Sequence, residues 1–522
     1  MSVNCIRHLL EVSAQTHGDK TALISENRRL TYAELLKRVN QIARYFSELG
    51  YPKGTRIGIY SDKSVEQVIA ILALLSTEYI FVPITRVLKP EQVDYIIQDC
   101  DIRCIVTDKI RYEKIGETGF GGKVVTYEAI DKDVPSFEEI YKYYNDRYTP
   151  KIKSFENAVI TYSFAASGLP KGIVITHRNL IDGARVVAQY LQLREEDIIS
   201  GVLSFNLDYG LNQIFCALYK RATLAIHKLV LPSDFFHHLI RDEVTVLPVM
   251  PIHITRMFDE DPHRLPTAEE LAHVRIITSS GGKLTTTMLE HIQTYFPDAR
   301  FFSMHGLTEA FRSAYLEPEQ IKIRPTSIGK AIPDVELYII NDAGEACKPR
   351  EVGELIHRGA CIYKGYWNSP EDTAMRFKSI KILEKVIPLE GQLTDEIVVA
   401  SGDYVYTDEE GYIYFHSRRD DMIKTSGYRV SPAEIERVVY DNLETVQSCA
   451  VFGIENEAIE EEIVLVYSAA AEIPKNELLF ELKKHLPNYM IPARIVYKRS
   501  IPLHYGKINK AALKEEILAN GA

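Results

Sequence analysis

Cysteine is scarce in this 522-residue sequence, and its seven occurrences are scattered along the chain. Only Cys100 and Cys104 lie close together, and no second pair completes a zinc site. An odd number of dispersed cysteines also provides no disulfide framework of the kind found in secreted proteins. We therefore expect buried, reduced thiols, as in a cytosolic protein.

Long apolar runs and an excess of basic residues are also missing. No apolar run approaches the roughly 18 to 20 residues of a membrane span. The segment 1–15 lacks the basic start and continuous apolar core of a signal peptide. The formal net charge of −11 argues against a broad nucleic-acid-binding surface, which requires clustered Lys and Arg. We therefore expect a cytoplasmic protein with no membrane span and no nucleic-acid partner.

The chain does contain a regular alternation of helical and strand-like segments. The stretch 30–49 has apolar residues at helical spacing, and Thr31 with Glu34 predicts a capping box at its start. A strand-like run at 56–61, a helical run at 65–76 and another strand at 79–84 follow. Such alternation predicts a largely parallel α/β architecture.

The pattern changes twice toward the C-terminal half. Around 353–368, strands punctuated by Gly replace the helices, which predicts a β-rich subdomain. A dense charge run at 416–430 then precedes about a hundred residues with short β and α elements of their own. By itself this charge run is typical of a solvated linker. Because the chain is too long for one core, we expect a large N-terminal domain, 1–419, and a small α+β domain, 420–522.

The stretch YSFAASGLPKG at 162–172 is the first candidate site. It is not a Walker A loop, because Pro170 rather than Gly precedes Lys171. Gly168 and Gly172 would let backbone N–H groups approach a phosphate, and Lys171 would supply charge. A plain turn between two strands is the alternative for this stretch taken alone.

Four further stretches strengthen the nucleotide interpretation. HGLTEA at 305–310 pairs the Thr308 hydroxyl with the Glu309 carboxylate, as a Mg²⁺–phosphate site requires. SGD at 401–403 offers a carboxylate suited to ribose hydroxyls. The other two are the charge run at 416–430 and YGKINKAAL at 505–513, which presents Lys507. Each stretch has a purely structural explanation, such as a helix cap or a turn. The five stretches in this order nevertheless favour a nucleotide-dependent enzyme.

These motifs resemble those of the adenylate-forming superfamily, which includes acyl-CoA synthetases, adenylation domains of nonribosomal peptide synthetases and luciferases. The similarity extends nearly end to end, through the stretches 28–43, 81–97, 328–333 and 365–377 to the last lysine motif. The resemblance implies ATP-dependent activation of a carboxylic acid, with Mg²⁺, to an acyl-adenylate and pyrophosphate. Transfer of the acyl group to a thiol would follow.

The resemblance also implies roles for individual residues. Thr308, Glu309 and Lys507 match catalytic positions, and Glu309 matches the Mg²⁺ ligand. His305 stands where the family usually has an aromatic residue near adenine and substrate. The positions that match nucleotide-binding residues are Ser163, Ser167, Gly168, Lys171, Gly172, Gly281, Gly282, His305, Gly306, Asp403 and Arg418.

The charge run acquires a function through the same resemblance. Asp420 falls at the family's hinge, so we expect the small domain to rotate there between two half-reactions. Gly427 resembles the glycine of the pantetheine tunnel, and Arg429 lies nearby. Lys507 would hold the carboxylate and α-phosphate during adenylation and would leave before thiol attack.

Three residues are candidates for binding the acid. Asp208 falls where amino-acid-activating relatives place the aspartate that binds the α-ammonium, although a helix N-cap is its alternative. Met304 is expected near the substrate. Arg312 would receive an anionic or hydroxylated side chain, pair with a neighbouring acid, or be neutralised by Asp208.

We favour activation of an amino acid and its transfer to the phosphopantetheine of a separate carrier protein. The chain ends fifteen residues after Lys507, so we expect no fused carrier domain. SGGKL and GLTEAFRSAYL are also similar to stretches of bacterial acyl-CoA ligases, so coenzyme A with a non-amino carboxylic acid remains an alternative. A nucleotide-binding pseudoenzyme without turnover is the third.

The phosphate loop departs from the family pattern, which reads close to TSGSTGxPKG. Phe164, Ala165 and Ala166 replace Ser, Gly and a Ser or Thr. Backbone N–H groups remain, but Ala165 lacks the conformational freedom of Gly. We expect a functional enzyme with weakened ATP or pyrophosphate contacts, in which restoring Ser, Gly and Ser would lower the KM for ATP.

Overall fold

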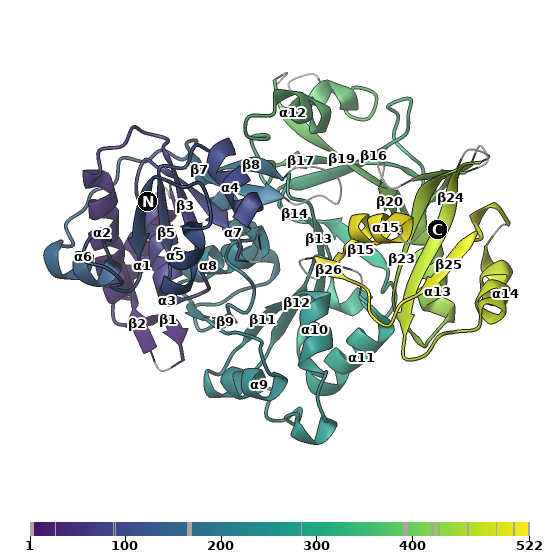
Figure 1. The fold of residues 1–522 in the computed structure, drawn as a ribbon, viewed down its shortest axis with the longest axis horizontal. Coiled ribbons are helices and arrows are strands. Elements are labelled where there is room, and N and C mark those ends of the chain that lie inside the picture. Colours follow the sequence, from purple (N-terminus) through teal and green to yellow (C-terminus); the bar gives the residue numbers. More distant parts are fainter. Residues whose placement is uncertain are drawn as a thin grey trace.

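Figure 1 shows the computed structural model of the chain, with the N-terminal part at the left and the C-terminal part at the right. The structure describes residues 5–26, 28–86, 88, 90–163, 170–282, 284–389, 395–418, 422–425, 428–456, 459–486, 488–504 and 507–519, and only the backbone of Ser163, Lys424, Tyr428, Arg429, Glu460, His504 and Lys507. The predicted α/β architecture is confirmed.

A six-stranded sheet occupies the N-terminal part, with strand order β6-β5-β3-β4-β7-β8. All its neighbouring strands are parallel except β8, which runs antiparallel to β7. Its strands are β3 (Arg56–Tyr60), β4 (Ile80–Ile84), β5 (Cys104–Thr107), β6 (Lys123–Thr126), β7 (Asn157–Ser163) and β8 (Lys171–Thr176). The associated helices are α2 (Tyr32–Glu48), α3 (Val65–Leu74), α4 (Pro90–Asp99), α5 (Lys109–Ile115) and α6 (Phe137–Tyr143).

Helix α2 begins as the sequence predicts. The Thr31 side chain accepts a hydrogen bond from the Glu34 N–H, and the Glu34 carboxylate accepts one from the Thr31 N–H. This capping box satisfies two backbone donors that the first helical turn leaves without partners.

A fourteen-stranded sheet forms the centre of the molecule. It is parallel from β10 through β9, β11 and β12 to β13, and antiparallel from β13 onward. Its strands are β1 (Thr21–Ser25), β2 (Arg28–Thr31), β9 (Ile198–Ser200), β10 (Thr223–Ala225), β11 (Val246–Val249), β12 (Ile276–Ser279), β13 (Arg300–Gly306), β14 (Arg312–Leu316), β15 (Ser327–Ala331), β16 (Val335–Ile340), β17 (Gly353–Gly359), β18 (Phe377–Ser379), β19 (Ile397–Thr407) and β20 (Ile413–Arg418). The antiparallel part contains the β-rich region expected around 353–368.

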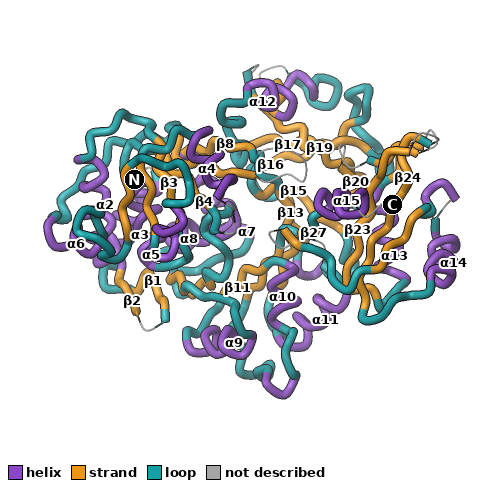
Figure 2. The backbone as a smooth tube through the Cα atoms, viewed as in Figure 1, coloured by secondary structure: helices purple, strands orange, loops and turns teal. Residues whose placement is uncertain are grey.

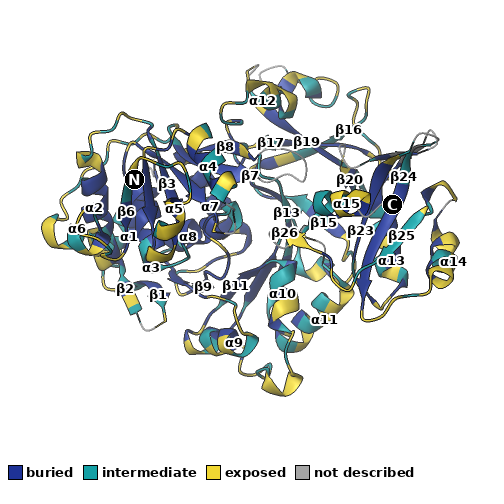
Figure 3. Ribbon diagram, in the orientation of Figure 1, coloured by how far each residue is buried: buried dark blue, intermediate teal, exposed yellow. Residues whose placement is uncertain are grey.

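One large apolar cluster contains side chains from both sheets. It joins side chains of strands from both sheets to α1 (Ile6–Thr16), α2, α3, α7 (His177–Tyr190) and α8 (Asp208–Lys220). Figure 3 shows these inner elements as largely buried. Helix α3 is apolar nearly all round, because it packs against neighbours on every side. The remaining helices of this part are α9 (Pro232–Arg241), α10 (Pro251–Met257), α11 (Thr286–Tyr295) and α12 (Pro370–Arg376).

The residues from 423 onward form a separate five-stranded sheet with its own apolar cluster. Figure 2 shows this sheet at the right, with helices beside it. Its strands are β21 (Ile423–Thr425), β22 (Tyr428–Val430), β23 (Val446–Asn456), β24 (Glu460–Ala469) and β25 (Arg494–Tyr497). The same part of the chain contains the helices α13 (Pro432–Asn442), α14 (Lys475–His485) and α15 (Lys510–Ala519), and the short antiparallel pair β26 (Leu503–His504) and β27 (Lys507–Ile508). The predicted boundary at Asp420 lies outside the described residues, so the two-domain division stays a prediction.

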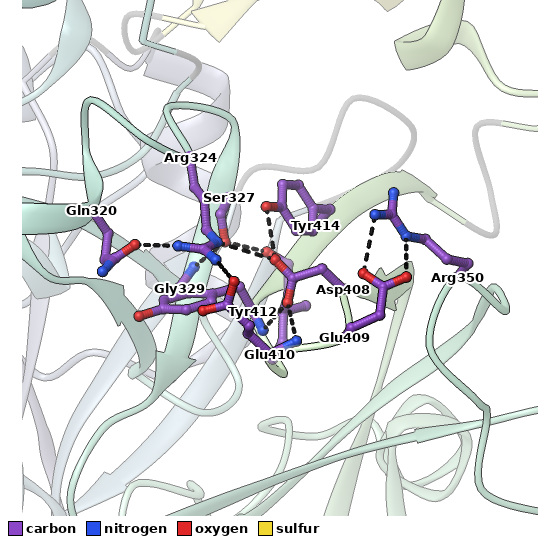
Figure 4. Close-up of polar contacts among 11 residues, drawn as sticks. Gln320, Arg324, Ser327, Gly329, Arg350, Asp408, Glu409, Glu410, Tyr412 and Tyr414 are labelled. Carbon is purple, nitrogen blue, oxygen red and sulfur yellow. Dashed lines mark hydrogen bonds and ion pairs between the residues drawn. The ribbon is translucent and has the colours of Figure 1, made fainter.

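A polar network closes the turn between β19 and β20, shortly before the chain enters this second sheet (Figure 4). The Asp408 carboxylate accepts hydrogen bonds from the backbone N–H groups of Glu410 and Tyr412 and, at 3.1 Å, from the Tyr414 hydroxyl. Arg324 donates to the same carboxylate at 3.1 Å and also contacts Gln320 and Glu410. The neighbouring pair Arg350–Glu409 is exposed.

All seven cysteines are free, and all are buried except Cys347, which is partly exposed, so the expectation of buried thiols holds for six of them. In the part of the chain that the structure describes, every helix is too short or too polar to cross a bilayer.

Candidate active site

The turn between β13 and β14 stands where the large sheet changes from parallel to antiparallel. Ligand sites of α/β proteins often lie at such a change, at the carboxyl ends of the parallel strands. A side chain at Gly306 would come within 2.2 Å of the Phe311 carbonyl oxygen, so only Gly allows this tight return. Phe311 itself adopts φ +47°. This turn carries Thr308 and Glu309 at the carboxyl end of β13.

The segment 363–367 joins this turn to strand β8. The Tyr363 N–H donates to the Glu309 carbonyl at 3.0 Å, and the Trp367 N–H donates to the Gly172 carbonyl at 2.7 Å. A side chain at Gly172 would meet the side chains of Ile160 and Trp367. Two predicted phosphate motifs, far apart in sequence, are therefore held against one connecting segment.

Lys171 and Glu309 both meet side chains from this region. The Tyr366 hydroxyl donates a hydrogen bond to the Glu309 carboxylate. Burial, together with this carboxylate, raises the pKa of Tyr366 above its ordinary range. The Lys171 ammonium lies 2.6 Å from the Asp372 carboxylate of α12 and 5.6 Å from the Tyr366 ring centroid. Tyr366 and Asp372 carry no sequence signal that predicts these contacts, although both lie inside the family-like stretch 365–377.

The Glu309 carboxylate suits a Mg²⁺ ion whose remaining ligands come mainly from the substrate and from water. No group of three or more His, Cys, Asp or Glu residues is placed to hold a metal among the described residues. Mg²⁺ is commonly held by one or two carboxylates while phosphates and water complete its shell. Glu309, with the Thr308 hydroxyl beside it in sequence, is the residue that would supply the protein ligand.

A second group of predicted residues meets across β19 and β20. Asp403 and Arg418 are register partners, and the Arg418 Nε lies 3.1 Å from the Asp403 carboxylate. His305 Nε2 is 3.6 Å from the other Asp403 oxygen and has no hydrogen-bond partner. Burial alone would raise the pKa of Asp403, but His305 and Arg418 outweigh it and hold this pKa below its usual value. An ionised, buried carboxylate suits the binding of ribose hydroxyls.

His357 is a neighbour of this group that the sequence analysis missed. It lies on β17 and is 1% exposed, and both its ring nitrogens lack hydrogen-bond partners. Burial, with His305 nearby, lowers the pKa of His357 to about 3, so its ring is neutral at pH 7. Only the non-local pairing of β17 with β19 brings it here, and no local motif marks it.

Gly281 and Gly282 follow β12 and lie against the start of α10. Gly281 has φ +88°, and a side chain at Gly282 would meet Pro251 at 3.2 Å. The backbone therefore passes close to α10 at the segment expected to line the adenine pocket.

The predicted acid-binding residues lie around α8 and β14. Asp208 is the first residue of α8, and its carboxylate accepts a hydrogen bond from the Tyr209 N–H at 2.8 Å. The N-cap position is Leu207, so Asp208 is not the cap itself. Asp208 lines a small cavity with Asn212, Phe311 and Tyr363. Met304 is buried and accepts a hydrogen bond from the Tyr190 hydroxyl at 3.0 Å.

Arg312 is buried beside this cavity. Its guanidinium carbon lies 4.3 Å from the Tyr209 ring centroid and 5.1 Å from that of Phe311. No described carboxylate lies within ion-pairing distance of Arg312. Among the described residues, Arg312 forms neither of the two pairings considered from the sequence, with a neighbouring acid or with Asp208.

Comparison with known proteins identifies the family. The family model described as "AMP-binding enzyme" matches residues 10–367. The chain is an AMP-binding enzyme. The predicted resemblance to the adenylate-forming superfamily is therefore confirmed at the level of the family.

The relatives of this AMP-binding enzyme include synthases that are more than twice its length. Tyrocidine synthase 1 of Brevibacillus parabrevis is 27% identical over 523 residues, covering 99% of this chain and 45% of the synthase. Gramicidin S synthase 1 of Brevibacillus brevis is 26% identical over 522 residues, with the same coverage of 99% and 45%. The chain thus spans less than half the length of these relatives.

Solved structures show the same fold. ATP-bound MatB from Rhodopseudomonas palustris superposes with a TM-score of 0.85 at 22% identity, covering 98% of this chain and 99% of MatB. The anthranilate CoA ligase AuaEII in complex with anthranoyl-AMP gives 0.85 at 22% identity, covering 100% and 99%. Both alignments include the small C-terminal sheet of this AMP-binding enzyme.

Several predicted residues of the AMP-binding enzyme lie outside the described residues. They are Phe164, Ala165, Ala166, Ser167, Gly168, Asp420 and Gly427. For Ser163, Arg429 and Lys507 the structure gives the backbone alone: Lys507 pairs with His504 in a short hairpin. Their roles stay predictions.

Proposed function

We propose that this protein activates a carboxylic acid with ATP, forming an acyl-adenylate and pyrophosphate, and then passes the acyl group to a thiol. One observation supports this most directly. Lys171 and Glu309, 138 residues apart in sequence, are both held by side chains of the segment from Tyr363 to Arg376. A cation and a carboxylate in that relation suit the phosphates of a nucleotide and the Mg²⁺ that accompanies them.

The chemistry needs charge neutralisation more than proton transfer, because a carboxylate attacks an anionic phosphate. In this proposal Lys171 exchanges Asp372 for phosphate oxygens and stabilises the departing pyrophosphate. Glu309 would hold Mg²⁺, and the bound ion would supply positive charge that compensates the phosphates. Asp403, kept ionised by His305 and Arg418, accepts hydrogen bonds from the ribose hydroxyls and fixes the nucleotide.

The acid is proposed to bind between α8 and β14, where Asp208 and Arg312 lie. An amino acid would place its α-ammonium against Asp208, because a partly buried carboxylate favours a cationic partner. The similarity to peptide synthases supports this choice, and the proposed acceptor is the phosphopantetheine of a separate carrier protein. The fold likeness to CoA ligases supports coenzyme A as the alternative acceptor.

Pyrophosphate–ATP exchange tests the proposal. The purified protein is supplied with ATP, Mg²⁺ and labelled pyrophosphate, and with amino acids, fatty acids or aryl acids in turn. Exchange that depends on one class of acid is the expected result. Exchange only with acids that lack an amino group would overturn the amino-acid part. No exchange with any acid, despite ATP binding measured by calorimetry, would leave a nucleotide-binding protein without turnover.

A further inference from the structure

Arg312 is a buried cation with an incomplete set of partners. Its side chain is 4% exposed, and its Nη2 is buried without any hydrogen-bond partner. Its surroundings are aromatic, since it lies over the Tyr209 ring and beside Phe311. Guanidinium groups in proteins stay charged at all ordinary pH values, so this residue cannot lower its energy by losing a proton.

Ring contacts and the neutral Tyr190 hydroxyl, which also meets Arg312, do not balance such a charge. An arginine over a ring gains a modest attraction, whereas an uncompensated buried charge is strongly destabilising. Because no described carboxylate lies within ion-pairing distance, the compensating group is absent from this part of the chain. A ligand anion placed at Nη2 would supply it.

The position of Arg312 connects it to the proposed chemistry. It follows Glu309 by three residues on the same tight turn, and its register partner on β13 is Gly306, next to His305. Tyr209, which its guanidinium covers, is anchored by a hydrogen bond of 2.7 Å to the Thr278 hydroxyl on β12. Arg312 therefore lies where the acid is proposed to bind. It is held there by the pairing of β14 with β13 and by its contact with Tyr209 of α8.

We propose that the acid activated by this protein carries a second anionic group, and that Arg312 binds this group through Nη2. This inference rests on the proposed adenylation and specifies its substrate class: dicarboxylic acids and acidic amino acids. One carboxylate reacts with ATP while the other ion-pairs with Arg312. Asp208, which lines the small cavity together with Tyr363, would receive the α-ammonium when the acid is an amino acid.

Matched acids that differ only at the distal group provide the test. Pyrophosphate exchange is measured with glutarate against pentanoate, succinate against butyrate, and L-glutamate against L-norvaline, together with longer and aromatic diacids. For the wild type we expect the dianionic member of at least one pair to be preferred by about 10²-fold or more in kcat/KM. In Arg312→Met that preference should disappear or reverse, and Arg312→Lys should retain part of it.

Arg300→Met is the control. Arg300 lies on the neighbouring strand β13 and also covers an aromatic ring, Phe302, at 5.1 Å, but its side chain is 40% exposed. It should leave the preference unchanged. Melting temperatures give a second readout: without ligand, Arg312→Met should melt higher than wild type, because an uncompensated charge has been removed.

The outcomes separate this inference from the proposed function. Exchange with no acid at all would overturn the proposed function. Efficient exchange with acids that carry a single anionic group, or a dianion preference that survives in Arg312→Met, would overturn the Arg312 inference while adenylation stands. A lower melting temperature of Arg312→Met with an unchanged preference would assign Arg312 to packing alone and would equally overturn it.

Discussion

Without a bound nucleotide, Lys171 forms an ion pair with Asp372. If Lys171 binds phosphate as proposed, its ion pair with Asp372 must open first, and this pair would then oppose ATP binding. Because Lys171 is 44% exposed, such a pair is weak, and its removal should have a modest effect. We predict that Asp372→Asn lowers the KM for ATP about two- to fivefold in the exchange assay.

Glu371→Gln provides the control, since Glu371 is the adjacent exposed carboxylate on the same helix. It should leave the KM for ATP unchanged. An increase in KM for Asp372→Asn would instead show that Asp372 positions Lys171 productively.

His177 makes the stability of the fold depend on pH. It is buried at the start of α7, its Nδ1 has no partner, and burial lowers its pKa to about 4 from an ordinary value near 6.5. The folded state thus resists protonation, so the stability contributed by the neutral ring is present above pH 6.5 and is lost as the pH falls toward 4. The shift corresponds to about 3 kcal/mol.

Urea unfolding of wild type and His177→Gln at several pH values measures this dependence. The difference in unfolding free energy between the two proteins should change by about 3 kcal/mol in favour of the variant from pH 7 to pH 4. A constant difference would mean that His177 does not titrate in this range.

At the scale of elements, local sequence patterns predicted those helices and strands that depend on neighbouring residues alone. The capping box of α2, strand β3 and helix α3 follow from short patterns of apolar, β-branched and capping residues. The contacts of Tyr366 with Glu309 and of Lys171 with Asp372 do not, because they depend on how the segment 363–367 pairs with β8. Periodicity carries no information about such non-local pairing.

The β19–β20 turn offers a prediction at this scale. Burial would raise the pKa of Asp408, but hydrogen bonds from the Tyr412 backbone and Arg324 outweigh it and keep the pKa low. The ionised Asp408 therefore stabilises the turn above about pH 4, and this stabilisation is lost as the pH falls further. Asp408→Ala should reduce the unfolding free energy at pH 7 by about 1–3 kcal/mol in urea titrations.

The adjacent Glu409→Ala is the comparison, because Glu409 pairs with Arg350 at the surface. Its urea midpoint should match that of wild type. Equal losses for both variants would mean that the network adds nothing beyond ordinary surface pairs.

For the whole molecule, the sequence predicted an α/β core, a β-rich region and a later compact segment, because each has its own hydrophobic pattern. Family likeness alone assigned Asp403, Arg418, Lys171 and Glu309 to one nucleotide site. In the structure Arg418 contacts Asp403, whereas Lys171 and Glu309 contact Asp372 and Tyr366 respectively, and the roles of all four stay predictions. His357 and the incomplete pairing of Arg312 escaped prediction, because both depend on which groups are absent around a buried side chain.

Lys507 provides the prediction at this scale. If the small domain rotates between half-reactions, Lys507 acts only in the first. Lys507→Ala should then slow pyrophosphate exchange by about 10²-fold or more while thiol transfer from a supplied acyl-adenylate stays near the wild-type rate. Single-turnover measurements of each half-reaction check this.

Lys510→Ala is a suitable reference, since Lys510 forms an ion pair with Glu436 inside the small domain. It should affect both half-reactions equally, if at all. Comparable losses in both for Lys507→Ala would contradict the rotation.

The tight return at Gly306 has a consequence for attempts to change what this protein accepts. Glu309 and Arg312 share one short hairpin whose backbone admits no side chain at Gly306. Mutations that reshape the acid end by moving this hairpin would also displace the phosphate end. New substrates should therefore be easier to obtain through α8, for example at Tyr209 or Asn212, than through the hairpin, and directed selections would be expected to accumulate changes on the helix.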